Sequence, residues 1–577
     1  MDASSLQLSP NRIGGALIAS AIGDALGWPN EHNNQRVGRA KGEERIPSHG
    51  GFETWSRWIG GRFYATEEPV RAGEYSDDTQ LLIATARSLL TAGERWFDPF
   101  TQSELPAWLS YERGGGRATK RAAQSWLKGT APWEERNESS VRRYFEAGGN
   151  GAAMRILPHI IVRAGSLENI RRDVLWNGIA THGHPRALVG ALVYAAALHA
   201  ALLKTGHWQL GELIEYVQDL GEIWRRIPTD SELPSHWLST SYKPSSSYVE
   251  SWTQTVHEVE EAIKLVQDGL DRGAIAIDED VLSQLGALNS ERSGAGTVTA
   301  IAALFLASRY AADPATGVRT AAYTKGADTD TLASMTAGLL GAMLSDEWIP
   351  SEWHSVQDMS FLQSLASSLA ALEEAELSIH LLSYSLHPWT EADAKRLRDR
   401  LQSNQRSRLE LGPLGNVKPV ESGVLHSRVK KVTSRRWCLR SEDGQTVYVT
   451  AHSRETSSQL QPTPTVPSRE PRDGPVRLDR MFAEVSALAD DIGPSLSAAD
   501  LLRVLLVVME RIRDTAGPSG NPAQLPAKPD LRAWLHDAVA SRRLPPLSDE
   551  ALLSIARVAW RIMYGGHVRP PQNGTDS

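Results

Sequence analysis

Apolar residues recur at helical spacing through most of residues 11–355, and the segments that carry this pattern are rich in Ala, Gly and Leu. Small residues of this kind allow neighbouring helices to approach closely. The pattern predicts buried helices at residues 11–27, 81–90, 187–203, 294–310 and 332–344. More exposed helices are predicted at residues 105–108, 118–128, 210–226 and 249–269. No convincing run of alternating residues indicates a strand here, so this part is predicted to be all-helical.

Two other kinds of pattern interrupt or follow the helices. Residues 32–73 lack clear periodicity and are predicted to form a long irregular loop. Further along, alternation typical of strands occurs at residues 424–432, 436–440 and 446–450, with a predicted hairpin turn at 442–444. The fold class is therefore predicted to be mainly α, with a small β module. The predicted domains are an all-helical domain at 1–355, a helical extension at 356–410 with helices at 370–382 and 391–401, the β module at 411–453, a Pro-, Ser- and Thr-rich linker at 454–476, and a C-terminal helical module at 477–577.

Composition narrows the classes of protein that the chain can represent. Its 577 residues are enough for several domains, and a net charge of −8 argues for neither a nucleic-acid coat nor an acidic tail. Cys438 is the only cysteine, which excludes an intramolecular disulfide and fits a reducing compartment. The N-terminal residues 1–10 lack the pattern of a secretory signal, and no unbroken apolar run is long enough to span a membrane. We expect a cytoplasmic protein with no membrane association.

Clusters of carboxylates and hydroxyls precede two of the predicted helices. The first is Ser76-Asp77-Asp78-Thr79, and the second is Asp328-Thr329-Asp330-Thr331. Oxygen atoms at the start of a helix can accept hydrogen bonds from free backbone N–H groups, or they can bind a hard divalent cation. One cluster would not decide between these roles. Two clusters of the same kind favour a metal site to which both contribute.

Other polar motifs have two interpretations each. The glycine-rich turn Gly148–Arg155 can present backbone N–H groups to a phosphate, or it can be a simple tight turn. In Thr181-His182-Gly183-His184-Pro185, His184 is predicted to cap a helix with Pro185 at its first position, whereas His182 can contact a ligand. No further His or Cys cluster completes a zinc site. Glu31, alone in a loop, has a functional role only if the fold brings it to the other motifs.

Taken together, five motifs resemble those of the ADP-ribosylglycohydrolase family, in the family's order and over about residues 11–355. The motifs are Gly23-Asp24-Ala25-Leu26-Gly27 with Glu31, Ser76-Asp77-Asp78-Thr79, Gly149-Asn150-Gly151-Ala152-Ala153-Met154-Arg155, Thr181-His182-Gly183-His184-Pro185, and Gly326-Ala327-Asp328-Thr329-Asp330-Thr331. The family includes the dinitrogenase reductase-activating glycohydrolase, the ADP-ribosyl-acceptor hydrolases and the J1 crystallins. Five motifs in order make a chance match improbable.

The resemblance implies an all-helical domain with two Mg²⁺ or Mn²⁺ ions that cleaves ADP-ribose from an acceptor. It implies metal ligands at Ser76, Asp77, Asp78, Asp328, Asp330 and Thr331. It implies substrate contacts at Gly149, Asn150, Gly151 and His182. Glu31 would be the catalytic acid or base, with Asp77 or Asp78 in that role if Glu31 only positions the substrate. Ser76 stands where relatives often have Thr, and Ala327 where they have Gly, and neither change removes a ligand.

Several alternatives stay open at this level. The protein can be a catalytically silent sensor of ADP-ribose or a related nucleotide that signals through its C-terminal modules, or it can have a structural role like that of a crystallin. The acceptor can be a protein side chain, a nucleic acid or a small molecule. The basic strands near Arg436 can bind nucleic acid, although charged residues at a sheet edge more often prevent unwanted strand pairing. The C-terminal helical module is expected to contact a protein partner.

Overall fold

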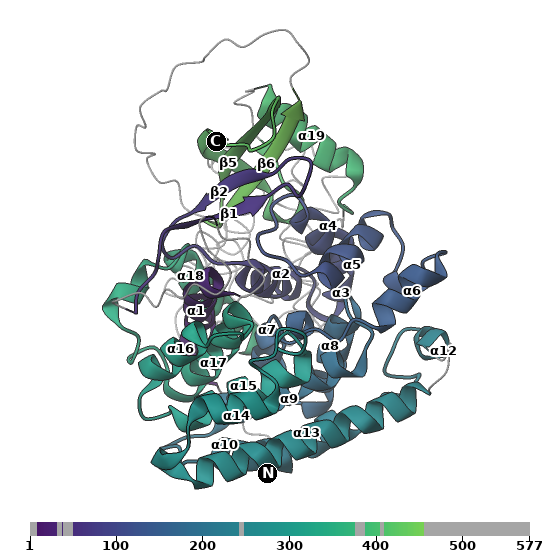
Figure 1. Ribbon diagram of the computed structural model, residues 1–577. Coiled ribbons are helices and arrows are strands. Elements are labelled where there is room, and N and C mark those ends of the chain that lie inside the picture. Colours follow the sequence, from purple (N-terminus) through teal and green to yellow (C-terminus); the bar gives the residue numbers. More distant parts are fainter. Residues whose placement is uncertain are drawn as a thin grey trace, which may run out of the picture. The chain divides into compact units, whose positions relative to one another are not determined.

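The computed structural model describes residues 8–31, 37, 50–241, 247–374, 387–403 and 409–454. The predicted linker at 454–476, apart from its first residue, and the C-terminal helical module at 477–577 lie outside the described residues. Most of the predicted helix at 370–382 lies outside them as well. In the described part, the prediction of a mainly α fold with a small β module is confirmed (Figure 1).

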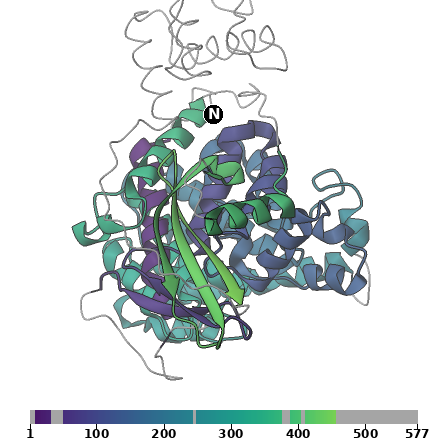
Figure 2. The same ribbon diagram turned by 90° about the horizontal axis from the view of Figure 1, so that it is seen from above.

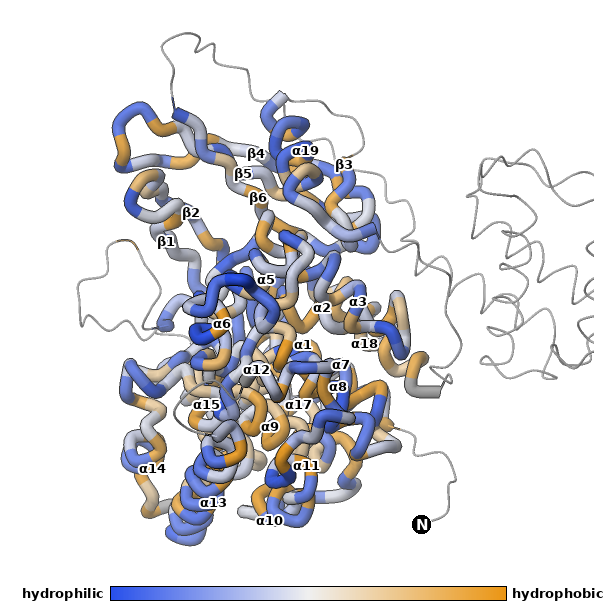
Figure 3. The backbone as a smooth tube through the Cα atoms, turned by 90° about the vertical axis from the view of Figure 1, so that its right-hand side faces the viewer, coloured by the Kyte–Doolittle hydropathy of each residue, from blue (hydrophilic) through white to orange (hydrophobic). Residues whose placement is uncertain are grey.

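Five buried helices form the centre of the helical part. They are α1 (Pro10–Gly27), α2 (Asp77–Ala92), α9 (Pro185–Leu203), α15 (Gly296–Arg309) and α17 (Thr329–Leu344). Figure 3 shows α9 and α17 as mainly apolar segments in the interior, whereas α6 (Glu138–Phe145) is polar. The five helices coincide with the segments that the sequence predicts to be buried, because most of their residues are apolar or small and can pack closely against neighbouring helices.

Helices α1 and α17 approach each other closely along their whole length. An added Cβ at Gly23 would lie 2.2 Å from the carbonyl oxygen of Ala333, and one at Gly27 would lie 2.1 Å from that of Thr329. The contact is therefore between backbones. The start of α17, which carries the second acidic cluster, is fixed directly against the end of α1.

Helix α9 is long and apolar enough to cross a membrane by length and composition. However, 89% of its most apolar 18-residue window is buried inside the protein. Other helices of the fold already cover its apolar surface. The helix thus has the properties of a central core helix.

The remaining helices surround this centre. They are α3 (Phe97–Pro99), α4 (Leu105–Trp108), α5 (Arg117–Leu127), α6, α7 (Leu157–Val162), α8 (Leu167–Ile179), α10 (Glu212–Asp219), α11 (Gly221–Arg225), α12 (Trp237–Ser241), α13 (Tyr248–Asp271), α14 (Asp278–Leu285), α16 (Pro314–Tyr323), α18 (Met359–Glu374) and α19 (Glu391–Gln402). The predicted helices at 105–108, 118–128, 249–269 and 391–401 are confirmed. The predicted helix at 210–226 is divided, since α10 ends at Asp219 and α11 begins at Gly221.

The prediction of an irregular loop at residues 32–73 is wrong in its second half. Strands β1 (Trp55–Ile59) and β2 (Thr66–Val70) form an antiparallel hairpin there, with Arg57 opposite Glu68. The burial along β2 alternates, and Glu68 occupies one of its inward-facing positions, where it is only 2% exposed. An ion pair with Arg57 of 2.6 Å compensates that charge. Charged residues at buried positions hid the strand pattern in the sequence.

The predicted β module is a four-stranded antiparallel sheet in the order β3-β4-β5-β6, which lies beside the β1–β2 hairpin (Figures 1 and 2). Its strands are β3 (Leu409–Glu410), β4 (Asn416–Leu425), β5 (Val432–Ser441) and β6 (Thr446–Arg454). The predicted turn at 442–444 joins β5 and β6 and is confirmed. The strand predicted at 424–432 is wrong, because β4 ends at Leu425 and a turn follows before β5.

The sheet packs directly on the hairpin and on the helical part. The backbone N–H of Glu67 donates to the carbonyl of His426 at 2.8 Å, and that of Arg428 donates to Ala65 at 2.9 Å. The hydroxyl of Tyr448 donates to Glu74 at 2.5 Å, just before α2. These bonds join strands near residue 430 to segments near residue 70. The domain boundaries at 355, 410 and 453 stay predictions.

Candidate active site

A cavity of about 940 Å³ opens where α2, α5, α17, the β1 strand and two glycine-rich turns meet. Ten of the eleven residues that the sequence predicts for the site line this cavity. They are Glu31, Asp77, Asp78, Gly149, Asn150, Gly151, His182, Asp328, Asp330 and Thr331. The fold therefore brings together motifs that are up to 300 positions apart in the chain. Ser76, the eleventh, does not line the cavity but is the residue directly before Asp77.

The first acidic cluster begins α2. Ser76 is the N-cap residue, and its hydroxyl accepts a hydrogen bond from the backbone N–H of Asp78 at 3.3 Å. The carboxylate of Asp24 in α1 provides the main cap: it accepts from the N–H of Ser76 at 3.0 Å and from the N–H and hydroxyl of Thr79 at 3.0 and 2.6 Å. Asp24 and the Ser76 hydroxyl together accept from the N–H groups of Ser76, Asp78 and Thr79, so the carboxylates of Asp77 and Asp78 are not needed to cap these groups.

The second cluster begins α17, but its N-cap residue has a different role. Asp328 is the N-cap residue but forms no side-chain cap hydrogen bond. Its Oδ2 instead accepts from the side-chain amide of Asn150 at 2.9 Å, and that amide also donates to the hydroxyl of Thr299 at 3.1 Å. Asn150 thus orients Asp328. The hydroxyl of Thr331 donates to Oδ2 of Asp78 at 3.3 Å, which links the two clusters directly.

Glu31 completes the acidic side of the cavity. It follows the short 3-10 helix η1 (Trp28–Asn30) that continues from α1. One carboxylate oxygen from each of Glu31, Asp328 and Asp330 lies within 4.8 Å of the other two. The Glu31 carboxylate is therefore close enough to those of Asp328 and Asp330 to share a cation with them. A functional role for Glu31 was predicted only for such an arrangement.

Burial and mutual repulsion perturb these carboxyl groups. Burial, together with Asp328 and Asp77, raises the pKa of Glu31 well above its usual range. Burial raises the pKa of Asp77 to about 8, and Glu112 and Asp24 add to the shift. The pKa values of Asp78 and Asp330 are also raised, first by burial and then by neighbouring carboxylates. Negative charge is thus concentrated here beyond what the surroundings compensate.

The donor set fits hard divalent cations. Among the described residues, none of the five carboxylates Glu31, Asp77, Asp78, Asp328 and Asp330 forms an ion pair with Lys, Arg or His. Oδ1 of Asp78 is buried and has no hydrogen-bond partner in this part of the chain. A buried carboxylate oxygen without a partner is unfavourable unless a cation binds it. Oxygen-only donors suit Mg²⁺, Ca²⁺ or Mn²⁺.

The glycine-rich turn at Gly149–Gly151 also lines the cavity. Residues Asn150–Ala152 form a single 3-10 turn (η5), and the N–H of Asn150 donates to the carbonyl of Gly294 at 2.9 Å. An added Cβ at Gly151 would lie 3.1 Å from Cε1 of His182. Glycine therefore leaves room for His182 and exposes backbone to the cavity. After this turn the chain continues into α7, which begins at Leu157.

The histidine motif divides into two roles, as the sequence predicts. Nδ1 of His184 accepts a hydrogen bond from the N–H of Arg186 at 3.1 Å, with Pro185 at the first position of α9, so the predicted cap is confirmed. His182 instead lines the cavity. Burial lowers the pKa of His182 to about 3, so its imidazole is neutral at physiological pH. Its Nδ1 lies 2.7 Å from the hydroxyl of Thr181.

Sequence reasoning missed several residues that shape the site. Asp24 and Arg155 belong to the motifs, but neither was given a role. Arg155 is fully buried and donates to the side-chain oxygen of Asn177 at 2.7 Å and to the hydroxyl of Thr181 at 2.7 Å, which fixes the histidine loop. Arg57 and Trp58 of β1 also line the cavity. No signal pointed to them, because the hairpin that carries them was not predicted.

Sequence comparisons with known proteins point to a single family. The family model described as ADP-ribosylglycohydrolase matches residues 5–378. The chain is 24% identical over 360 residues to the ADP-ribosylhydrolase ARH3 of Danio rerio, covering 59% of this chain and 85% of that protein. It is 27% identical over 190 residues to the ADP-ribosyl-dinitrogen reductase glycohydrolase of Rhodospirillum rubrum, covering 32% of this chain and 56% of that enzyme.

A third relative is the ADP-ribosylarginine hydrolase Tri1 of Serratia proteamaculans, which is 28% identical over 189 residues, 30% of this chain and 43% of that protein. The family model extends over well more than half of the chain and includes all five motifs. The chain therefore belongs to the ADP-ribosylglycohydrolase family and is a glycosidic-bond hydrolase.

Proposed function

We propose that this protein removes ADP-ribose from a modified acceptor, using two Mg²⁺ or Mn²⁺ ions bound by the acidic clusters. The observation that carries the proposal is the convergence of Glu31, Asp78 and Asp330 with the other predicted residues on one cavity. Relatives whose names describe ADP-ribosyl hydrolysis support the substrate class. The size of the cavity, about 940 Å³, is ample for a dinucleotide-sized ligand.

The proposed metal ligands are the carboxylates and hydroxyls at the starts of α2 and α17. They are Ser76, Asp77, Asp78, Asp328, Asp330 and Thr331. When bound, the cations would hold vicinal ribose hydroxyls and lower the pKa of a bound water. The direct bond from Thr331 to Asp78 supports a site shared by both helices. The hydroxyl of Ser76 can serve only if it gives up its weak bond of 3.3 Å to the N–H of Asp78 or uses its second lone pair.

The chain's own residues would orient the substrate and move the proton. Departure of the acceptor from the anomeric carbon builds positive charge on the ribose, which the surrounding carboxylates stabilise. Glu31 is the proposed acid or base, because it lies at the edge of the acidic group and in the cavity. Asp77 or Asp78 takes that role if Glu31 only positions the substrate.

The remaining cavity residues suit the rest of ADP-ribose. Gly149 and Gly151 expose backbone in a turn, where a diphosphate can approach without meeting a side chain. Asn150 is proposed to act in part through Asp328, which it already orients. The neutral imidazole of His182 can form a hydrogen bond with a ribose hydroxyl through its Nε2.

The first test is the release of ADP-ribose from arginine-linked, serine-linked and DNA-linked substrates with Mg²⁺, with Mn²⁺ and after chelation. The control is the double variant Asp328→Ala with Asp330→Ala. We expect release from at least one substrate that depends on the metal and is lost in the double variant. Absence of release from every substrate, with ADP-ribose still bound, would refute the proposed activity. The substrate that reacts would identify the acceptor.

A further inference from the structure

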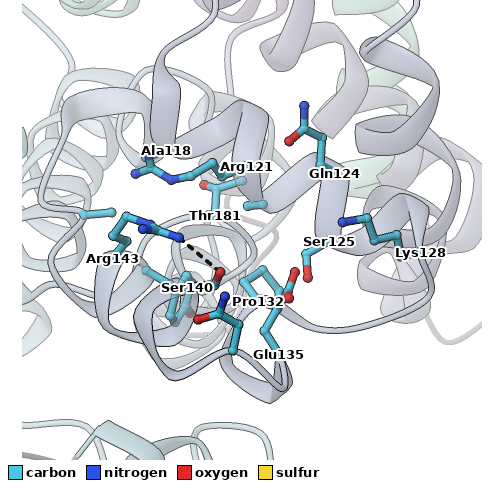
Figure 4. A pocket seen from close by; sticks show the side chains of 14 residues that line it. Ala118, Arg121, Gln124, Ser125, Lys128, Pro132, Glu135, Ser140, Arg143 and Thr181 are labelled. Atoms are coloured by element: carbon cyan, nitrogen blue, oxygen red, sulfur yellow. Dashed lines mark hydrogen bonds between the residues drawn. The ribbon is translucent and has the colours of Figure 1, made fainter.

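A second pocket of about 340 Å³ lies between α5 and α6, next to the proposed active site (Figure 4). We call it the basic pocket, because its charged side chains are Arg121, Lys128 and Arg143 against the single carboxylate of Glu135. In Figure 4, Arg121 and Arg143 lie on one side of the pocket and Lys128 lies on the other. Its other polar lining residues are Gln124, Ser125, Asn137, Ser140, Tyr144 and Thr181.

The three cations of the basic pocket lack anionic partners in the described part of the chain. Arg121 and Lys128 form no ion pair there, and Arg143 donates only to the hydroxyl of Ser140 at 3.2 Å. In contrast, the neighbouring Arg142 on the same helix pairs with Glu146 at 3.5 Å. Desolvation, and then repulsion from Arg143 and Arg117, lowers the pKa of Arg121. Like charges are therefore held together in a concave site, an arrangement that a bound anion would stabilise.

The basic pocket and the active-site cavity share a wall. Ala118 and Arg121 of α5 line both. Thr181 lines the basic pocket, whereas the next residue, His182, lines the cavity, and their side chains are 2.7 Å apart. A ligand whose one end lies near His182 can thus extend a substituent past Arg121 into the basic pocket.

The distribution of charge along the cavity indicates which end of the substrate lies near the carboxylates and which end lies near α5. The carboxylates gather at the starts of α2 and α17, where a ribose held through cations would lie. Arg117 and Arg121 of α5 lie on the cavity wall that adjoins the basic pocket. In the proposed function, the diphosphate lies along Gly149–Gly151, so the adenosine end of the substrate points toward His182 and α5.

We propose that the basic pocket binds a phosphate monoester carried by the adenosine ribose of the substrate, at its 2′ or 3′ position. The inference rests on the proposed function, because that function sets the direction of the ligand. A phosphate monoester carries close to two negative charges at neutral pH. Two arginines and a lysine can meet it with charge-assisted hydrogen bonds, and the hydroxyl of Ser140 adds a further donor. The hydroxyl of Ser125 already donates to the carbonyl of Thr130 at 2.9 Å.

Isothermal titration calorimetry on the full chain with Mg²⁺ tests this inference. The ligands are ADP-ribose, ADP-ribose 2′-phosphate, ADP-ribose 3′-phosphate and inorganic phosphate. The proteins are the wild type, Arg143→Gln, Lys128→Gln and the matched control Arg142→Gln. We expect one phosphorylated ligand to bind at least about tenfold tighter than ADP-ribose, the scale of one hydrogen bond between charged groups. Arg143→Gln and Lys128→Gln should each lose most of that preference, and Arg142→Gln should keep it.

Two results would overturn the inference. One is equal affinity for ADP-ribose and both phosphorylated ligands. This includes the case in which Arg143→Gln weakens the binding of inorganic phosphate but of no nucleotide. The other is a preference that persists in both Arg143→Gln and Lys128→Gln. The outcomes also separate this inference from the proposed function. Release of ADP-ribose without any phosphate preference refutes only the inference, whereas Arg143-dependent binding of a phosphorylated ligand without release refutes only the activity. Binding of no nucleotide refutes both.

Discussion

Replacing Gly23 by Ala tests whether the packing of α1 on α17 positions the acidic clusters. The new Cβ would lie 2.2 Å from the carbonyl oxygen of Ala333, and ordinary contact begins near 3.4 Å, so the helices must separate by about 1.2 Å. Both sides of this contact are backbone, and no side chain can rotate away. Ala333 lies one turn after Asp330, so the movement reaches the proposed ligands.

The expected magnitude follows from two opposing effects. Overpacking in a well-packed core costs about 1–3 kcal/mol, and more where the backbone must move. Ala instead of Gly inside a helix returns up to about 1 kcal/mol. We expect the free energy of unfolding to fall by about 2 kcal/mol, which for a domain of this size corresponds to a drop in melting temperature of about 2–3 °C. Release of ADP-ribose should fall as well.

Gly14→Ala is the matched control, because it lies in the same helix and nothing is within 4 Å of its added Cβ. This variant gains helix propensity without a clash, so its melting temperature should stay equal or rise slightly. Differential scanning fluorimetry on the wild type and both variants measures the difference. A Gly23→Ala protein that melts and reacts like the wild type would refute the reasoning, as would a Gly14→Ala protein that is equally destabilised.

Three further predictions concern the site and the core. Glu31→Gln should retain metal binding by calorimetry but lower turnover by about 10²-fold or more, and full activity would refute its role as acid or base. Asn150→Ala removes the bond of 2.9 Å that orients Asp328, so the metal concentration needed for half-maximal activity should rise by about 10- to 100-fold, and an unchanged value would contradict this. Burial lowers the pKa of His159 to about 4, below its value of about 6.5 in an unfolded chain. Above pH 6.5 the imidazole is neutral in both states, whereas between pH 6.5 and 4 only the unfolded chain binds the proton. The free energy of unfolding should therefore decrease as the pH is lowered from 6.5 to 4. His159→Gln should flatten that slope in urea titrations, and an unchanged slope would contradict the assignment.

The sequence predicted best what depends on neighbouring residues. The buried helices follow from local periodicity, and the starts of α2 and α17 follow from hydroxyls and carboxylates placed before an apolar run. The cap at His184 was predictable for the same reason, since Pro185 fixes the first position of α9. The order of the motifs predicted that they share one site, and residues from all five motifs line one cavity in the structure.

What the sequence missed depends on partners far away in the chain. Asp24 caps α2 across 52 positions, and nothing near Asp24 indicates a helix start as its partner. The β1–β2 hairpin was missed because Glu68 is a buried charge that Arg57, Arg113 and Arg436 compensate, and two of these three partners lie far away in the chain. The basic pocket was missed because Lys128 directly follows α5 whereas Arg143 lies in α6, and each alone resembles an ordinary surface cation.

A buried network of charges connects the four-stranded sheet with the proposed active site. Glu74 accepts hydrogen bonds from Arg113 at 2.8 Å and from the hydroxyl of Tyr448 in β6 at 2.5 Å. The guanidinium of Arg113 also lies 4.4 Å from the ring centroid of Tyr448. Arg113 directly precedes Gly114, and an added Cβ at that glycine would lie 3.0 Å from the carboxylate of Asp77.

This network gives the β strands a role in the geometry of the site. Buried charges need all their partners, since removal of one leaves the others desolvated and unpaired. Arg436 of β5 donates to the carbonyl of Pro69 in β2 at 2.5 Å, so the sheet also fixes the hairpin whose first strand lines the cavity. The glycine loop beside Asp77 and the hairpin wall are thus both held by residues that come after position 430. Within the described residues, the strands belong to the structure that shapes the cavity, although none of the five family motifs includes them.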